Sequence, residues 1–168
     1  VCNSLSKTYS ITGWRLGYVI ANPEIIDRVK KVHDFLTVGA AAPLMEAATV
    51  GLKFDDKYYD ELAAHYAHMK EVFVGGLKKL GLKYTDPQGA YYVLVDVSEF
   101  GVKDDVKFCE WMAQYVGVAA VPGSSFFRED VHNLVRFHFA KQDDTLNEAI
   151  KRLATLKEKA MNPTDVDW

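Results

Sequence analysis

The stretch from Asp55 to Gly81 constrains the fold more than any other part of the chain. Apolar or small residues recur in it at spacings of three and four, the pattern of a helix with one buried face: Tyr59, Leu62, Tyr66, Met69, Phe73, Gly76 and Leu80. Asp55 or Asp56 can cap its start, and Gly81 is placed to end it. We therefore predict one long helix to Leu80 that packs this stripe into the core.

Start signals predict further helices on both sides of this one. Asn22-Pro23-Glu24 combines a capping side chain, a proline at the first helical position and an acid near the positive end of the helix dipole. Helices are predicted over 22–35, 43–54, 104–117 and from 143 onward. The apolar face of the first helix consists of Ile25, Ile26, Val29 and Val32. The residues expected to point inward from the other three are Leu44, Ala47, Ala48 and Leu52; Phe108, Cys109, Met112, Tyr115 and Val116; and Leu146, Ile150, Leu153 and Leu156.

Runs rich in β-branched and aromatic residues predict strands between these helices. The strongest is Ala90–Val97, and the others cover 1–5, 14–21, 118–121 and 134–140. Asp86 to Gly89 and Pro122 to Ser125 have the composition of tight turns, and the tail from Met161 to Trp168 is expected to fray. The order of elements predicts an α/β chain with a second, smaller α+β layer.

Composition narrows the class of protein. The chain has 168 residues, 49% of them hydrophobic and 26% charged, and a net charge of −3, as in a soluble globular protein. No basic face and no bilayer-length apolar run is evident, so neither nucleic acid nor a membrane is an expected partner. Cys2 and Cys109 are too few for a disulfide framework, no histidine has the spacing of a metal ligand, and we expect Cys109 to be a buried thiol. These features fit a reducing cytoplasm.

Chemistry is concentrated between Ser4 and Gly17, in the stretch SLSKTYSITGWRLG. Lysine amines form Schiff bases with carbonyl compounds such as pyridoxal phosphate. Lys7 can supply such an amine, while a guanidinium fork from Arg15 and the hydroxyls of Ser4 and Ser6 suit phosphate oxygens. Taken alone, a Ser-x-Ser-Lys sequence is more often a solvated loop, but Lys7 and Arg15 stand in one continuous pattern.

That pattern closely resembles the lysine segment of class I/II aminotransferases, pyridoxal-phosphate enzymes of fold type I. Their sequence is Ser-x-Ser/Ala-Lys, a short gap, then Gly-Trp-Arg-Leu/Ile-Gly, and every fixed position is present here. The resemblance implies that Lys7 holds pyridoxal 5'-phosphate and that Ser4, Ser6 and Arg15 bind its phosphate. Gly13 would let the backbone pass close to the cofactor.

The resemblance also implies a domain plan. In this family the lysine lies past the middle of a chain of roughly twice this size, which suits two domains. We therefore expect residues 1–56 to be the C-terminal part of the large domain, and residues 57–168 to be a long linking helix and the small domain. Active sites of the family lie at a dimer interface, so the complete enzyme is expected to be a homodimer. Several cofactor contacts of the family precede the lysine, so we expect the isolated chain to bind cofactor poorly and not to turn over.

A second segment, Asn133 to Ala140, places an arginine inside an apolar strand, where its charge needs a partner. By itself Arg136 suggests an ion pair with an acid of this chain. The segment resembles the family's Val/Ile-Arg-Phe/Leu-x-Phe/Tyr-Ala, whose arginine binds the substrate carboxylate, and we favour that role. His138 replaces a common Ser or Cys; it should face away from Phe137 and Phe139 and be a structural neighbour rather than a base.

Three functions stay open. The first is transamination between an amino acid and a 2-oxo acid, with Lys7 moving the proton at Cα and Arg136 holding the carboxylate. Segments 105–112 and 117–127 look like the methionine/kynurenine/glutamine branch, with the aspartate branch as the near alternative. The loop 122–127 could tune side-chain preference, or be an ordinary turn. Tyr92 follows a Gly-Ala pair that the family also shows, but packing in the sheet would explain it equally well. The other functions are a pyridoxal-phosphate lyase or synthase of the same fold, and a folded module without activity.

Overall fold

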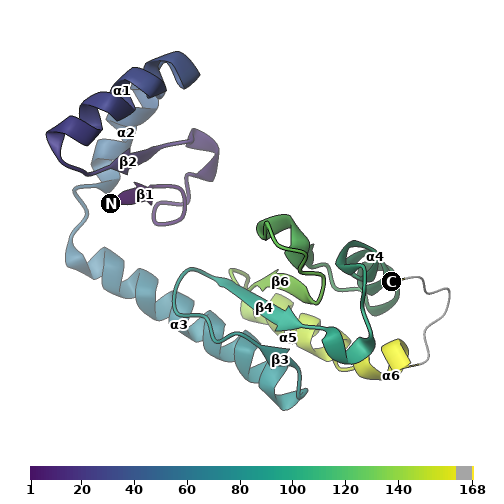
Figure 1. The fold of residues 1–168 in the computed structure, drawn as a ribbon. Coiled ribbons are helices and arrows are strands. Elements are labelled where there is room, and N and C mark those ends of the chain that lie inside the picture. The colour runs from purple at the N-terminus through teal and green to yellow at the C-terminus, as the bar shows by residue number, and fades with distance from the viewer. Residues whose placement is uncertain (162–167) are drawn as a thin grey trace. The chain divides into compact units, whose positions relative to one another are not determined.

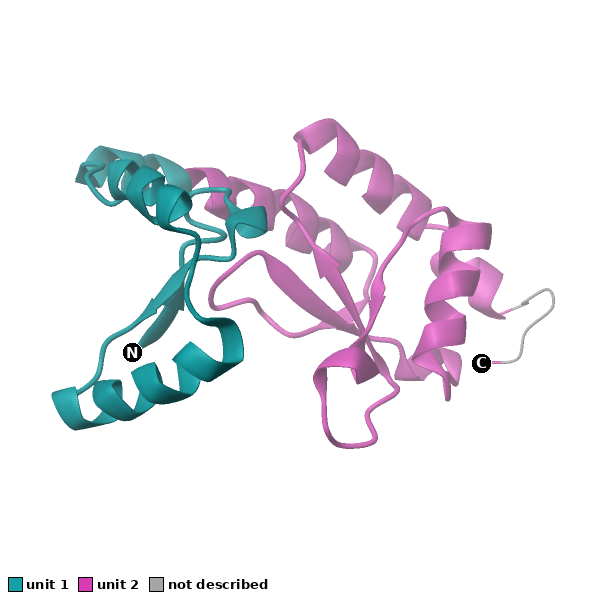
Figure 2. Ribbon diagram, turned by 90° about the horizontal axis from the view of Figure 1, so that it is seen from above, with its two compact units in different colours: residues 1–62 teal, residues 63–168 magenta. Residues whose placement is uncertain are grey.

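The computed structural model describes residues 1–161 and Trp168, and divides the chain into two compact units, Val1–Leu62 and Ala63–Trp168 (Figure 2). Both units contain helices and strands, so the prediction of a mixed α/β chain is confirmed (Figure 1). The boundary between the units lies within the long helix α3, Asp56–Lys79. The expectation that the two parts are portions of a large and a small domain stays a prediction.

Unit 1 is built around a short hairpin. Strands β1 (Cys2–Ser4) and β2 (Gly17–Val19) are antiparallel, and a helical turn at Thr12–Trp14 lies between them. Helices α1 (Pro23–Thr37) and α2 (Ala42–Gly51) follow. The predicted strand 14–21 is shorter than expected because its first residues take the helical turn and Arg15 adopts a left-handed conformation.

The predicted cap of α1 is confirmed, and its predicted apolar face is not buried. The side chain of Asn22 accepts the N–H of Ile25 at 3.0 Å. None of the residues of α1 is buried, and Val32 is 59% exposed. The core of unit 1 is small and consists of Leu5, Leu16 and Ala48, with Tyr9, Ile11, Trp14 and Leu44 partly buried against it.

Unit 2 contains a four-stranded antiparallel sheet of order β3-β4-β6-β5. Its strands are β3 (Lys83–Tyr84), β4 (Tyr92–Asp96), β5 (Val121–Pro122) and β6 (Leu134–His138). Its helices are α4 (Asp105–Trp111), which continues into a wider turn over Met112–Val116, α5 (Asp143–Leu153) and α6 (Leu156–Met161). A strand was predicted over 118–121, but pairing begins only at Val121. The predicted turn at 122–125 is one helical turn, Gly123–Phe126.

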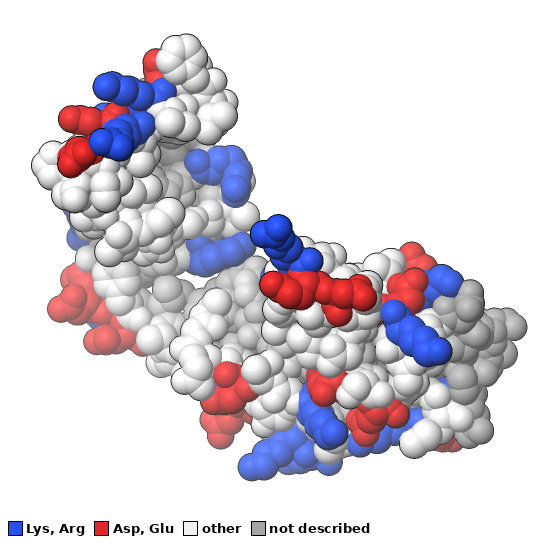
Figure 3. Space-filling view, in the orientation of Figure 1, with Lys and Arg blue, Asp and Glu red and all other residues white. Residues whose placement is uncertain are grey.

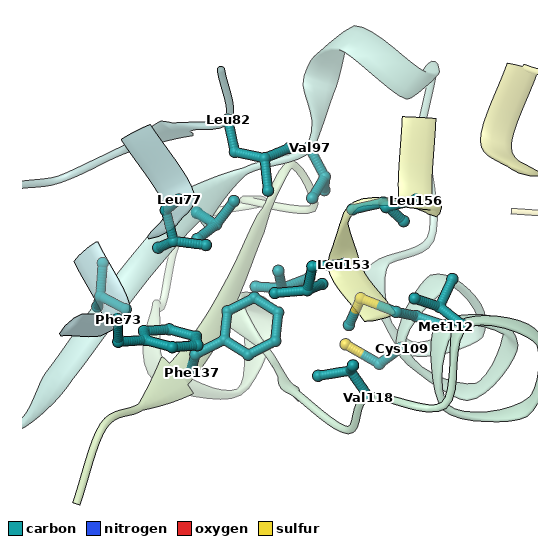
Figure 4. Packing of buried hydrophobic residues seen from close by; sticks show 14 of the residues in the cluster. Phe73, Leu77, Leu82, Val97, Cys109, Met112, Val118, Phe137, Leu153 and Leu156 are labelled. Carbon is teal, nitrogen blue, oxygen red and sulfur yellow. The ribbon is translucent and has the colours of Figure 1, made fainter. Parts of the chain in front are cut away.

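One face of this sheet packs on the main core. Val93 and Val95 of β4 and Val135 and Phe137 of β6 are buried against helices α3 to α6. Phe73 of α3 meets Phe137 with ring centroids 5.8 Å apart (Figure 4). Because side chains alternate across a strand, the residues between these point to the other face, which is only half-buried or exposed.

The ends of α3 and of the chain follow their local chemistry. Gly81 has a φ of +64°, the left-handed conformation expected of a glycine that ends a helix. Met69, Phe73 and Gly76 of the predicted stripe are buried. The frayed tail was predicted over residues of which 162–167 lie outside the described part, but Trp168 packs on Trp111 with ring centroids 4.6 Å apart.

Charges are mixed over the surface. Acidic and basic side chains alternate on the face shown in Figure 3, on both units. Within the described residues, the helices lack a segment that is both long and apolar enough to cross a membrane. The same residues contain no group of three or more histidine, cysteine or acidic side chains suited to a metal ion.

Candidate active site

The loop that carries Lys7 is closed at its base by the hairpin. The N–H of Leu5 donates to the carbonyl of Leu16 at 3.1 Å, and both side chains are buried. A Cβ on Gly17 would lie 2.7 Å from the carbonyl oxygen of Asn3, so a glycine is required where the two strands pair. Because both of its ends are held by these contacts, the loop between Leu5 and Leu16 is one constrained segment.

The two predicted serines form a hydroxyl pair. The Ser4 hydroxyl donates to the Ser6 hydroxyl at 2.7 Å, and also accepts the backbone N–H of Ser6 at 3.1 Å. Ser6 is 7% exposed, and few other polar side chains of the described residues are as buried. The pair is therefore a fixed polar feature of the loop.

Thr12 joins the remaining predicted residues. Its hydroxyl donates to the carbonyl of Ser6 at 3.2 Å and lies 3.5 Å from Lys7 Nζ, while its own carbonyl accepts Arg15 Nη1 at 2.8 Å. The structure thus brings Ser4, Ser6, Lys7 and Arg15 into one connected cluster. Thr12 was missed by the sequence analysis because it lies in the gap between the two fixed parts of the pattern.

The charge and conformation of this cluster suit an anionic group. Lys7 and Arg15 are exposed, and residues 1–20 contain no Asp or Glu. Ser10 and Arg15 have φ values of 55° and 56°, in the left-handed region that side chains other than glycine rarely adopt. Backbone strain of this kind is often found at functional sites. A phosphate with three acceptor oxygens would find two cations and hydroxyl donors here.

Aromatic residues support the far side of the loop. The Tyr58 hydroxyl donates to the carbonyl of Thr8 at 2.6 Å, and the hydroxyls of Tyr9 and Tyr59 are 2.7 Å apart. The hydrogen bond with Tyr59, together with burial, raises the pKa of Tyr9 to about 12. Sequence reasoning assigned Tyr59 to the core stripe of α3 and did not detect this contact. The start of α3 therefore holds the residues that follow Lys7.

Arg136 lies at the centre of the sheet of unit 2. It faces Leu94 of β4 and Val121 of β5, on the side of the sheet away from the main core. Its guanidinium carbon lies 4.2 Å from the ring centroid of Tyr92 and 3.7 Å from that of Phe126. Among the described residues no acidic side chain forms an ion pair with it, in contrast to the ion-pair alternative. Its charge is instead stabilised by the two aromatic faces.

A pocket of about 300 Å³ lies beside this arginine. Its lining is mainly apolar and consists of Thr85, Asp86, Pro87, Tyr92, Leu94, Phe126, Phe127 and Arg136. Neither Tyr92 nor Phe126 was identified as a partner of Arg136 from the sequence. A carboxylate bound here would meet one unpaired cation with apolar walls around it, which suits a small amphipathic acid.

His138 shares the open face of the sheet with Arg136. It is exposed, whereas Phe137 and Phe139 are buried, so the predicted orientation is confirmed. Partial burial of the ring, followed by the charges of Lys141 and Arg136, lowers the pKa of His138. The imidazole is therefore neutral near pH 7.

Comparison with known proteins gives a consistent result. The family described as aminotransferase class I and II matches residues 1–153. A methionine aminotransferase of Escherichia coli is 37% identical over 92% of this chain, and a probable kynurenine–oxoglutarate transaminase of Saccharomyces cerevisiae is 30% identical over 92%. The structure of an aspartate aminotransferase from Thermotoga maritima superimposes with a TM-score of 0.81 at 34% identity, covering 94% of this chain. The chain spans about 40% of the length of these relatives.

Proposed function

The chain belongs to the class I and II aminotransferase family, and we propose on that premise that it is the C-terminal part of an enzyme that moves an amino group between an L-amino acid and a 2-oxo acid. The observation that carries the proposal is the cluster of Ser4, Ser6, Lys7 and Arg15 around Thr12. The residues present fit pyridoxal phosphate, because an amine, a guanidinium and paired hydroxyls lie in one segment without an acid.

Each residue of the cluster has a proposed role. Lys7 holds the aldehyde carbon of the cofactor through its amine, and Ser4, Ser6 and Arg15 bind the phosphate with hydroxyl and guanidinium donors. When bound, pyridoxal phosphate supplies an aldehyde that accepts amino groups and a ring that takes up electrons released at Cα. With its amine free, Lys7 would remove the proton from Cα as a general base and would deliver it, as a general acid, to the cofactor carbon instead of back to Cα.

Arg136 is the proposed anchor for the substrate carboxylate. The guanidinium has no acidic partner among the described residues and rests on aromatic rings, so its N–H edge is available for a carboxylate. Holding the carboxylate fixes the direction of the Cα–H bond, which favours proton transfer by orientation. His138 is not assigned a catalytic role.

The proposed substrate class and the proposed oligomeric state rest on the relatives. The methionine and kynurenine enzymes favour an apolar or aromatic amino acid as substrate, and the apolar pocket beside Arg136 agrees with that choice. The similarity to an aspartate aminotransferase leaves an acidic amino acid as the alternative substrate. The homodimer of the complete protein is part of the same proposal.

Borohydride trapping tests the cofactor site directly. The complete protein that contains this chain is incubated with pyridoxal phosphate, treated with borohydride, which fixes the cofactor covalently on the amine that holds it, and mapped by peptide mass. We expect a single adduct on Lys7, absent from Lys7→Ala and retained in the matched control Lys53→Ala. Adducts scattered over surface lysines would contradict the proposal.

Product analysis separates the reaction classes. With an amino acid donor and a 2-oxo acid acceptor, a transaminase yields the new amino acid and the new 2-oxo acid in equal amounts. A lyase or synthase of the same fold releases an elimination product whether or not the acceptor is present. Dependence of product on the acceptor therefore supports transamination.

A further inference from the structure

The segment from Gly123 to His132 connects β5 to β6 and carries one of the two rings that contact Arg136. Phe126 lies in the first turn of this segment, 3.7 Å from the guanidinium carbon. Phe126 is 47% exposed, so packing against the core does not by itself fix its position. Something else must hold the segment in place.

A buried carboxylate anchors the start of the segment. Asp105, in the first turn of α4, is 0% exposed. Its Oδ2 accepts the backbone N–H of Ser124 at 2.8 Å, and its Oδ1 lies 3.1 Å from Nδ1 of His132. Burial alone would raise the pKa of Asp105, yet the bonds from Ser124 and His132 hold it below its ordinary value. The same carboxylate therefore binds both ends of the segment.

His132 lies between Asp105 and a second carboxylate, that of Asp130. Its Nε2 lies 2.8 Å from Oδ1 of Asp130, so each ring nitrogen faces a carboxylate oxygen. Since carboxylates only accept, both nitrogens must donate, which requires the imidazolium form. The hydrogen bonds with Asp105 and then Asp130 raise the pKa of His132 accordingly. These two acids are the charged partners of His132 among the described residues.

The segment also approaches β6 closely. A Cβ on Gly123 would clash with the carbonyl oxygen of Leu134, two residues before Arg136 in β6. The base of the segment therefore packs directly on the strand that carries the arginine.

We infer that His132 is a positioning residue, which bridges Asp105 and Asp130 and thereby holds Phe126 against the guanidinium of Arg136. The bridge joins α4 to the end of the segment, and Ser124 ties its beginning to the same carboxylate. The inference rests on the proposed function in one respect, namely that the pre-set guanidinium is the group that binds the substrate carboxylate. A fixed Arg136 loses less rotamer freedom on binding than a mobile one.

The test uses nuclear magnetic resonance on the 168-residue chain. The Nε–H proton of Arg136 experiences ring currents from Phe126 and Tyr92, so its chemical shift reports directly on stacking. In His132→Ala we expect this signal to move toward the value of an unstacked arginine. The matched control is His68→Ala, which removes a comparable histidine–aspartate contact, His68 with Asp143 at 2.9 Å, elsewhere in unit 2. The control should leave the Arg136 signal unchanged.

A second pair of variants avoids the core and keeps the test decisive if His132→Ala does not fold. Asp130→Asn and Glu129→Gln each remove one exposed carboxylate of the segment, but only Asp130 contacts His132. We expect Asp130→Asn to move the Arg136 signal in the same direction as His132→Ala, and Glu129→Gln to leave it in place. Identical spectra for this pair, or an unchanged Arg136 signal in a folded His132→Ala, would overturn the inference.

Titration with 2-oxoglutarate links the positioning to the proposed function. If Arg136 binds carboxylates, its signals shift with added 2-oxoglutarate, and the affinity falls by about fivefold in His132→Ala, from the ordering cost of one side chain. If the Arg136 signals of the unaltered chain do not shift with 2-oxoglutarate, the proposed binding of a carboxylate by Arg136 is refuted. The inference about His132 is tested separately, because the stacking comparison is made without ligand.

Discussion

At the scale of single residues, two glycines in the lysine segment have different constraints. A Cβ on Gly17 would meet the carbonyl oxygen of Asn3 at 2.7 Å, whereas one on Gly13 would meet nothing within 4 Å. We expect Gly17→Ala to lower the free energy of unfolding of unit 1 by about 1–3 kcal/mol, the usual cost of overpacking. Gly13→Ala should change it by less than about 0.5 kcal/mol, as expected at an open site. Chemical denaturation of both variants measures the difference.

The Gly13→Ala variant also tests whether the bound cofactor lies close to the backbone at Gly13. If the backbone at Gly13 passes close to pyridoxal phosphate, Gly13→Ala reduces the yield of the borohydride adduct on Lys7 although the fold is intact. Equal adduct yields in Gly13→Ala and the unaltered protein would show that the space beside Gly13 is not used by the cofactor.

Tyr92 is expected to stabilise Arg136 through its ring and not through its hydroxyl. The guanidinium carbon lies 4.2 Å from the ring centroid. Tyr92→Leu should lower the free energy of unfolding by about 0.5–1 kcal/mol from the lost cation–π contact, and Tyr92→Phe should retain it. Denaturation of unit 2, followed by the fluorescence of its tryptophans, gives the comparison. Equal loss in both variants would assign the effect to the hydroxyl.

The pair of His68 and Asp143 makes stability depend on pH. The hydrogen bond with Asp143, followed by its charge, raises the pKa of His68 above its ordinary value of 6.5. A raised folded-state pKa gives a stabilisation that is complete below the unfolded value and disappears as pH rises through the folded value. The stability difference between the unaltered chain and His68→Ala should thus be fully present below pH 6.5 and decline as pH rises through the raised pKa of His68. A difference that grows with pH would contradict this assignment.

At the scale of elements, α1 leaves apolar side chains uncovered in this chain. Ile25, Val32, Phe35 and Leu36 are each at least half exposed, and Phe35 is 93% exposed. Large exposed apolar patches bind hydrophobic dyes and promote association. We expect the 168-residue chain to bind such a dye and to self-associate, and Val32→Lys together with Leu36→Lys to reduce both. The control Lys31→Gln, on the same helix, should leave both unchanged.

The helices were predictable because their boundaries depend on nearby residues. Asn22 and Asp104 cap α1 and α4 through backbone groups two or three residues away, and Gly81 and Gly117 follow helices in the left-handed conformation. Strands were less predictable, because their length depends on a partner. Pairing with β6 begins only at Val121, so the apolar residues 118–120 lie outside the strand.

The candidate site divides in the same way. Lys7, Ser4, Ser6, Arg15 and Arg136 stand in continuous patterns and could be proposed from the sequence. The rings on Arg136 and the bridge from His132 to Asp105 could not, because these contacts join residues far apart in the chain. These side chains show no distinctive pattern in the sequence. They come into contact only through the pairing of β4 with β6 and the packing of α4.

At the scale of the whole chain, the two units differ in the size of their cores. Unit 1 buries Leu5, Leu16 and Ala48, while unit 2 buries a continuous cluster drawn from α3, its central strands and the helices that follow. Since buried apolar area is the main source of stability, the unit that carries Lys7 should open more readily than the unit that carries Arg136.

Hydrogen exchange measures this difference along the chain. We expect the amides of β1, β2 and α1 to exchange much faster than those of β4, β6 and the second half of α3, because local opening of unit 1 exposes little apolar surface. Any ligand that binds only the folded form protects the unit that binds it. Since the chain spans about 40% of its relatives, we expect saturating pyridoxal phosphate to leave exchange in the isolated chain unchanged and to protect the Lys7 loop in the complete protein. Protection of that loop in the isolated chain would mean that the cluster around Thr12 suffices to hold the cofactor.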